Sequence, residues 1–439
     1  MPKPQAGAYK GRLPPHMTSS RTIPTRWIIF WVLALGYILV YFHRLCTAVV
    51  AVDMMRDLAA GATLIGVLAS AYFYPYALMQ LPAGLLADSL GPRRTITIFF
   101  LVAGIGSAVI GLAQTAPVAI AGRLLVGIGV AMLFVPTLKV LASWFTPREF
   151  ASTTGILVAM GGVGSLTAAA PLAFASARIG WRMSFMAVAA LTVVASACIW
   201  LIVRDRPPEG SAEHAAVAEH HDGGNIGLAR GIGMVLHEAR FWPLAAWFFF
   251  TSAIFFAYGG LWGGPYLMQV HGMDRAQAGN VLSMIALGMI LGSPLHSFLS
   301  DRVFRARKPV ILLCCLATLG IAAAFAFFTA SLPVPVLYAL TFGLGFFSNA
   351  IVVIGFTVTK EMFPLSIAGT ATGLVNFFPF MGGAVFQPVL GYLLDLQGKA
   401  GDAYTLAGYR HAFLALLGCA VVALVSALFI KETLVKKGG

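Results

Sequence analysis

Long apolar stretches alternate with short polar ones along almost the whole chain. A helix of about 20 apolar residues spans the hydrocarbon core of a bilayer, and twelve stretches reach roughly that length. The pattern therefore predicts an all-α polytopic membrane protein with twelve transmembrane helices. The expected spans lie at about 27–52, 62–86, 94–114, 117–144, 152–175, 182–203, 241–269, 276–299, 309–329, 334–361, 367–395 and 409–430.

One longer polar segment divides the twelve spans into two groups of six. Residues 204–240 contain Pro207-Pro208, Gly223-Gly224 and several acids, which is typical of a linker. The first 26 residues are polar and rich in proline, which is typical of a disordered tail. We therefore expect a tail over 1–26, an N-terminal six-helix bundle over 27–203, a linker over 204–240, a C-terminal six-helix bundle over 241–430 and a tail over 431–439.

The distribution of charge predicts the orientation of these spans. Only 10% of residues are charged, against about 25% in soluble domains. Segments on the side of the N-terminus hold 20 of the Lys and Arg residues, the opposite loops hold 6 and the spans hold 3, which accounts for all 29. Basic loops stay in the cytoplasm, so we expect both termini there, in a bacterial inner or plasma membrane. The net charge of +13 is thus mainly a topology signal, and it does not indicate a nucleic-acid partner.

The two groups of spans repeat each other. Gly84–Arg94 closes the second span, and Ser297–Arg307 closes the eighth with a similar pattern of charges. Gly180-Trp181-Arg182 opens the sixth span, and Gly408-Tyr409-Arg410 opens the twelfth. Both groups begin on the same side of the membrane, so the repeat is parallel, about an axis along the membrane normal.

The first of these loops resembles a motif of the major facilitator superfamily. Gly84-Leu-Leu-Ala-Asp88-Ser-Leu-Gly91-Pro-Arg93-Arg94 matches the pattern G-x-L-x-D-x-x-G-x-R-R/K of that family. The resemblance implies two rigid bundles that rock about a central cavity, with this loop as a latch on the cytoplasmic side. The alternative is a loop whose charges only fix the topology. The expected gate residues are Gly84, Asp88, Gly91, Arg93 and Arg94 with Asp301 and Arg302 of the second copy.

Arg44 is a permanent charge inside the first apolar stretch. It lies about 25 Å from Trp27 along a helix, past the middle of the membrane. A cation at this depth faces a protein interior or a water-filled cavity and marks a functional site by default. Helical spacing places Tyr37 and Tyr41 on the face of Arg44, where they could form an anion site. The alternative is an internal salt bridge or a bond to backbone carbonyls.

The surroundings of Arg44 resemble one branch of the superfamily. Tyr41-Phe-His43-Arg44 is similar to the first span of the organic-phosphate antiporters and anion–cation symporters, in which the arginine binds the anionic group of the substrate. His43 stands where the proton-coupled sugar-acid symporters have an acid, and the seventh span has no second arginine. The resemblance thus favours a carboxylate or a zwitterion over a phosphate ester as substrate.

Other polar residues of the spans are further candidates. Tyr72, Tyr76 and Gln80 lie on one face of the second span. Besides Tyr37, Tyr41 and Arg44, the residues expected to bind the substrate are Tyr76, Tyr258, Trp262 and Asn376. Bonds between helices are the alternative role for each. His43 titrates near neutral pH and could couple a proton to transport, or could be structural. Arg123 resembles the fourth-span arginine of proton-coupled members, which implies a coupling or conformational role.

Several classes of function are disfavoured. No P-loop, paired carboxylates or metal-ligand spacing occurs within the spans, so we expect neither an enzyme nor a bound cofactor or metal.

The hypothesis is a secondary transporter of a small organic anion, acting by alternating access, with a proton or another ion as a possible coupled partner. A drug/proton antiporter and a transporter-like membrane sensor are the alternatives. The substrate, the coupling ion, the direction and the oligomeric state stay open, with a monomer as the default.

Overall fold

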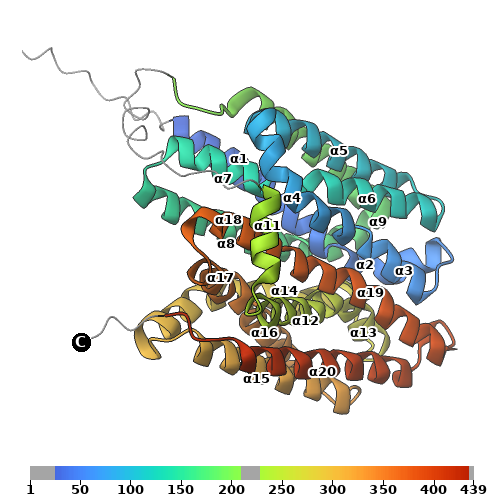
Figure 1. The fold of residues 1–439 in the computed structure, drawn as a ribbon. Coiled ribbons are helices and arrows are strands. Elements are labelled where there is room, and N and C mark those ends of the chain that lie inside the picture. The colour runs from blue at the N-terminus through green and yellow to red at the C-terminus, as the bar shows by residue number, and fades with distance from the viewer. Residues whose placement is uncertain (1–24, 209–227, 435–439) are drawn as a thin grey trace, which may run out of the picture.

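The computed structural model describes residues 25–208 and 228–434, and nearly all of them are helical (Figure 1). The tail expected over 1–26 and the middle of the linker thus lie almost wholly outside the described residues. The first half contains α1 (Thr25–Leu45), α2 (Thr47–Asp57), α3 (Ala62–Ser70), α4 (Phe73–Ser89), α5 (Pro92–Leu112), α6 (Ala116–Ala131), α7 (Phe134–Trp144), α8 (Pro147–Thr167) and α9 (Ala170–Ile202).

The second half begins after a short linker helix, α11 (Leu228–His237). It contains α12 (Phe241–Ala257), η1 (Tyr258–Trp262), α13 (Gly263–Gln269), α14 (Arg275–Phe298), η2 (Leu299–Val303), α15 (Lys308–Phe327), α16 (Val334–Ser348), η3 (Ile351–Gly355), α17 (Phe356–Met362), α18 (Leu365–Val375), α19 (Phe377–Gln397), the two-residue strands β1 (Lys399–Ala400) and β2 (Ala403–Tyr404), and α20 (Leu406–Phe429). The η elements are π-helical turns.

Local sequence explains where several helices begin. Thr146 and Glu149 form a reciprocal capping box at the start of α8, and Asp274 and Gln277 form another at the start of α14. Proline occupies the first turn of α5, α6, α15 and α16, where its missing N–H costs nothing.

Eleven helical segments of the described chain are long and apolar enough to cross a membrane. The longest, 152–202, is kinked at Gly180, whose φ of +77° interrupts the helix. The two parts of this segment match the fifth and sixth expected spans, so the fold agrees with the prediction of an all-helical membrane protein with twelve passages.

Several passages contain a break or a π-helical turn, which the apolar pattern did not predict. The first breaks at Cys46 between α1 and α2, directly after Arg44 and Leu45. The seventh, eighth and tenth contain the π-helical turns η1, η2 and η3. Such turns shift the faces of a helix and frequently occur at functional sites.

The two halves pack side by side, with the first drawn blue to green and the second yellow to red in Figure 1. Between them, α3 and α4 pack against α19, and α14 packs against α8 and α9. We call the end at which α1 begins and α20 ends the terminal end. The opposite end, where α2, α3 and α13 lie, is the distal end.

The halves are bonded to each other at the distal end. Asp395 of α19 accepts hydrogen bonds from the backbone N–H groups of Ala62 (3.0 Å) and Thr63 (2.7 Å) at the start of α3. Arg275 of α14 forms an ion pair with Asp53 of α2. Within the described residues, no hydrogen bond joins the two halves at the terminal end. The structure is therefore closed at its distal end.

Candidate functional site

Arg44 lies in the last turn of α1, directly before the break at Cys46, and is only 5% exposed. Three aromatic rings surround its guanidinium group. The guanidinium carbon lies 4.3 Å from the ring centre of Tyr41, 5.0 Å from that of Tyr76 and 4.9 Å from that of Phe380. Tyr41 and Tyr76 belong to the first half and Phe380 to the second, so this cation lies at the interface between the halves.

The guanidinium group of Arg44 has no carboxylate partner in the described part of the chain. No described residue forms an ion pair with it, and its buried Nε has no acceptor; its polar neighbours are the hydroxyl groups of Tyr72 and Tyr76. Aromatic faces attract the cation but cannot accept its in-plane N–H groups as an oxygen does. The site therefore retains unused hydrogen-bond donors and a full positive charge.

The tyrosines expected beside Arg44 lie together. Tyr37 contacts Tyr41 edge-on, with ring centres 5.3 Å apart, and stacks on Phe134 at the same distance. Because α1 is a continuous helix up to Leu45, the predicted shared face of Tyr37, Tyr41 and Arg44 is present.

A polar pair joins the halves close to this group. Asn376, at the break between α18 and α19, donates its side-chain N–H to Oε1 of Gln80 at 3.2 Å. Gln80 lies one turn from Tyr76, and Asn376 one turn from Phe380. The amide pair thus lies on the terminal side of the arginine.

Tyr258 and Trp262 do not lie with Arg44. The Tyr258 hydroxyl bonds Thr341 at 3.1 Å, and its ring lies 4.8 Å from Phe325, inside the second half. Trp262 donates to the backbone oxygen of Gln387 at 2.8 Å. Both polar groups are satisfied there, which explains their burial away from the arginine.

His43 lies about 100° around α1 from Arg44 and faces α9 and Arg123 of α6. His43 Nε2 lies 3.4 Å from the hydroxyl of Thr192, and Arg123 donates to the backbone oxygen of His43 at 2.9 Å. Arg123 also lies over the ring of Tyr72, which stacks on Tyr76. The stacked tyrosine pair therefore contacts both buried cations.

The expected gate loop makes contacts within its own half. Asp88 pairs with Lys139 of α7, not with Arg93 or Arg94 as its neighbourhood in sequence suggested. Gly91, with φ of +83°, turns the chain between α4 and α5. Lys139 also donates to the backbone oxygen of Gly84 at 2.8 Å.

The basic residues of this loop differ in their surroundings. The backbone N–H of Arg93 donates to Asp205 at 2.7 Å, and its side chain donates to the backbone oxygen of Trp200. Arg94 is exposed. In this conformation the loop is therefore braced by the start of the linker.

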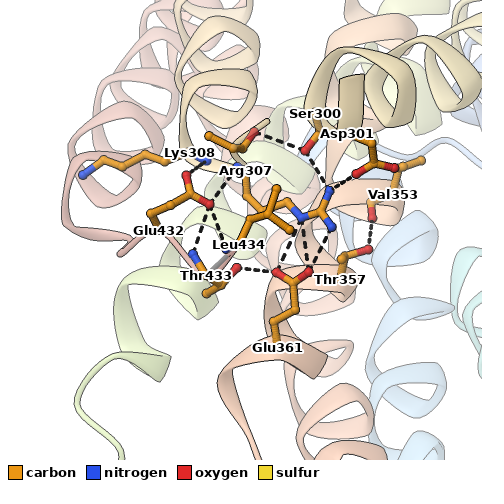
Figure 2. A network of polar contacts seen from close by, with 11 residues as sticks. Ser300, Asp301, Arg307, Lys308, Val353, Thr357, Glu361, Glu432, Thr433 and Leu434 are labelled. Atoms are coloured by element: carbon orange, nitrogen blue, oxygen red, sulfur yellow. Dashed lines mark hydrogen bonds and ion pairs between the residues drawn. The ribbon is translucent and has the colours of Figure 1, made fainter. Parts of the chain in front are cut away.

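The second copy of the loop forms a larger polar network (Figure 2). Arg307 pairs with Asp301 and with Glu361 of α17, and donates to Ser300 at 2.9 Å. Glu432, just after α20, accepts from the backbone N–H of Arg307 at 2.9 Å. Arg302, expected to act in this loop, is exposed, and Arg307 lies at the centre of the network instead.

Sequence reasoning missed several of these residues. Phe380 gave no signal because a phenylalanine in an apolar span is typical of any core. Lys139 and Arg307 were visible as charges, but their partners Asp88 and Glu361 lie 51 and 54 residues away, on other helices. The bond from Thr63 to Asp395 spans 332 residues, and no local pattern predicts it.

Known proteins resemble this chain over nearly its whole length. It is similar to a probable sulfoacetate transporter of Cupriavidus necator, with 25% identity over 431 residues, or 94% of this chain and 95% of the relative. It is similar to a hexuronate transporter of Bacillus subtilis, with 24% identity over 402 residues, or 88% and 92% of the two chains. Both relatives are named as transporters of organic acids, so they do not support the expected resemblance to the organic-phosphate branch.

A solved structure shares the fold. It is a bacterial homologue of the human lysosomal transporter Spinster, described as inward-facing and unoccupied; the TM-score is 0.72 at 20% identity, over 93% of this chain and 97% of that one. The model of the family described as Major Facilitator Superfamily matches residues 33–264 and again 257–438. The chain therefore belongs to the Major Facilitator Superfamily, as a membrane transporter and not an enzyme.

Proposed function

We propose that this protein is a secondary active transporter that moves a small organic anion by alternating access, with Arg44 as the residue that binds the anionic group. The observation that carries the proposal is the buried guanidinium group of Arg44, which has no carboxylate partner in the described residues and whose Nε has no acceptor. A carboxylate entering the site would supply the missing charge and accept two parallel N–H bonds.

A carboxylate or a zwitterion fits this site better than a phosphate ester. A phosphate dianion is commonly held by more than one cation, whereas the aromatic cage contains one arginine. Sulfoacetate and hexuronate, the substrates in the names of the two relatives, both carry a carboxylate. We therefore place the protein nearer the anion–cation symporters than the organic-phosphate antiporters.

We assign the remaining substrate contacts to the residues near Arg44. Tyr37, Tyr41 and Tyr76 offer hydroxyl groups, and Gln80 and Asn376 offer amide donors for the polar part of an anion. Tyr258 and Trp262 do not join this set, because their polar groups are bonded inside the second half. His43 and Arg123 are proposed to transmit movement between α1 and α6 through their backbone contact.

The charge distribution orients the proposed cycle. With basic loops retained in the cytoplasm, the terminal end faces inward and the distal end outward. The structure then represents a carrier closed to the outside, and the 27–203 and 241–430 bundles would rock about Arg44 to open it. The gate residues Asp88 and Asp301 would change partners during this movement. We expect a monomer in a bacterial inner membrane.

Thermal unfolding of the purified protein tests this proposal. A ligand that binds only the folded state raises the midpoint of unfolding. We would compare wild type and Arg44→Gln against organic anions, amino acids and lipophilic cations. Stabilisation of wild type alone by one class of anion supports the proposal, and liposome uptake of that class would follow.

Other outcomes assign other functions. Equal stabilisation of both proteins by lipophilic cations would favour a drug/proton antiporter and make Arg44 structural. Binding of an anion without uptake into liposomes would favour a membrane sensor.

A further inference from the structure

The aromatic cage around Arg44 is made jointly by the two halves that move in transport. Phe380 is its only described ring from the second half, and this residue is 5% exposed. Its ring centre lies 4.3 Å from that of Tyr76 and 6.1 Å from that of Phe256. Phe380 is therefore wedged between a ring of the first half and a ring of its own half.

The amide pair holds Phe380 in this place. Asn376 lies one helical turn before Phe380 and bonds Gln80 across the interface. Gln80 in turn donates to the backbone oxygen of Tyr76 at 3.4 Å. The ring and the amide bond thus cover Arg44 together.

Alternating access has a difficult step when the site is empty. A carrier that has released its substrate must pass through a state closed at both ends before it returns. In that state a bare arginine loses contact with water, which is costly in the membrane. The face of an aromatic ring offsets part of this cost, most strongly where water is excluded.

We propose that Phe380 shields the bare guanidinium group of Arg44 and so allows the empty carrier to change its access. When an anion pairs with Arg44, the charge is neutralised and the shield is no longer needed. The wild-type protein can then perform net transport. A variant without the ring of Phe380 would mainly exchange one anion for another. The part of this inference that concerns flux rests on the proposed function.

A first experiment follows the empty carrier without any substrate. Ser283 of α14 accepts a bond from the backbone N–H of Ala170 at 3.3 Å, between the halves near the distal end, and is 6% exposed. A cysteine at this position reacts with an impermeant maleimide, added outside right-side-out membrane vesicles washed free of organic anions, only while the distal end is open. The parent without Ser283→Cys reports the background of the five natural cysteines, four of which are buried.

We expect Phe380→Leu to slow alkylation of Ser283→Cys about tenfold, because leucine keeps the apolar bulk and loses the ring face. Phe380→Tyr keeps the ring and should react within about twofold of the parent rate. Phe380→Met provides a second variant without a ring if the leucine variant does not fold, as judged by its thermal midpoint. An unchanged or faster rate in the folded variants without a ring overturns the proposal.

A second experiment compares two fluxes in liposomes loaded with the anion found by thermal unfolding. Net efflux into anion-free buffer requires the return of the empty carrier, whereas exchange does not. We expect Phe380→Leu to lower net efflux about tenfold and exchange less than about twofold. An equal fall in net efflux and exchange would contradict the proposal that Phe380 shields Arg44. Phe380 would then be a residue that binds the substrate or packs the core. If wild type carries no organic anion, the proposed function fails, and the alkylation rates still decide the role of Phe380.

Discussion

Asp395 of α19 accepts hydrogen bonds from both the backbone N–H and the hydroxyl of Thr63, at 2.7 and 2.5 Å, and so caps a helix of the opposite half. The start of a helix presents unpaired N–H groups and a partial positive charge, which a carboxylate satisfies well. The cap exists only while the distal end is closed. Asp395 therefore stabilises one conformation of the carrier and not the fold of either half.

Asp395→Asn should open the distal end more often. Replacing the carboxylate weakens the cap by about 1 kcal/mol, because such caps contribute about 0.5–2 kcal/mol, and this raises the open population about fivefold. The measurement is the rate at which Ser283→Cys is alkylated from outside. Asp402→Asn, a change at an exposed acid nearby, should leave the rate unaltered. Equal rates in the two variants would show that the cap does not control opening.

Gly264 allows a close approach between the halves. A Cβ atom at this position of α13 would lie 1.8 Å from the backbone oxygen of Ala48 in α2. Gly264→Ala should therefore disfavour the closed distal end by about 1–3 kcal/mol, as overpacking does elsewhere. The same alkylation assay should show a faster reaction.

Gly418→Ala is the matched control for this glycine, because a Cβ atom there meets no atom within 4 Å. It should leave alkylation unchanged and should not lower the thermal midpoint, since alanine favours a helix more than glycine. If Gly264→Ala and Gly418→Ala show the same alkylation rate, the close contact between α2 and α13 does not control opening of the distal end.

Glu432 gives the network of Figure 2 a dependence on pH. Partial burial alone raises the pKa of Glu432, but the backbone N–H groups of Arg307, Lys308, Thr433 and Leu434 together outweigh it and hold this pKa below its usual range. A carboxyl group with a lowered pKa stabilises the folded state above its unfolded pKa of about 4.3, and this contribution disappears as the pH falls further.

Glu432→Gln should accordingly lower the thermal midpoint at pH 7 by about 1 °C, since exposed charge contacts are weak and the chain is long. The difference from wild type should shrink below about pH 4. Glu238→Gln changes another exposed acid on the same end of the fold and serves as the control. A difference that persists at low pH would assign the effect to side-chain packing.

The site was predictable where it depends on a continuous helix. Tyr37, Tyr41 and Arg44 share a face because α1 has regular spacing up to Leu45. Tyr258 and Trp262 illustrate the limit, because the π-helical turn η1 changes the faces of the seventh passage. An apolar pattern records only that a segment is buried, and not where its helix is interrupted.

Contacts between distant segments were beyond local reasoning for a different reason. Asp88 is close in sequence to Arg93 and Arg94, yet its partner is Lys139. A charged residue binds the opposite charge that the fold brings nearest, and helix packing decides which one that is. The role of Phe380 beside Arg44 depends likewise on the packing of α19 against α4.

Arg44→Lys separates the geometry of the site from its charge. Lysine keeps the positive charge but loses the planar fork that binds a carboxylate through two N–H groups. We expect the affinity for the anion to fall about tenfold, which corresponds to one charge-assisted hydrogen bond. The measurement is a titration of the thermal midpoint with the anion that stabilises wild type.

Arg178→Lys is the control, because Arg178 also lies over an aromatic ring, Phe174, but away from the interface between the halves. Its affinity should equal that of wild type. If Arg44→Lys also binds as tightly as wild type, the site recognises charge alone, since a compact ammonium group would serve as well as the fork. A carboxylate would then hold no advantage over other anions, and the choice of substrate would depend on Tyr41, Tyr76 and the Gln80–Asn376 pair.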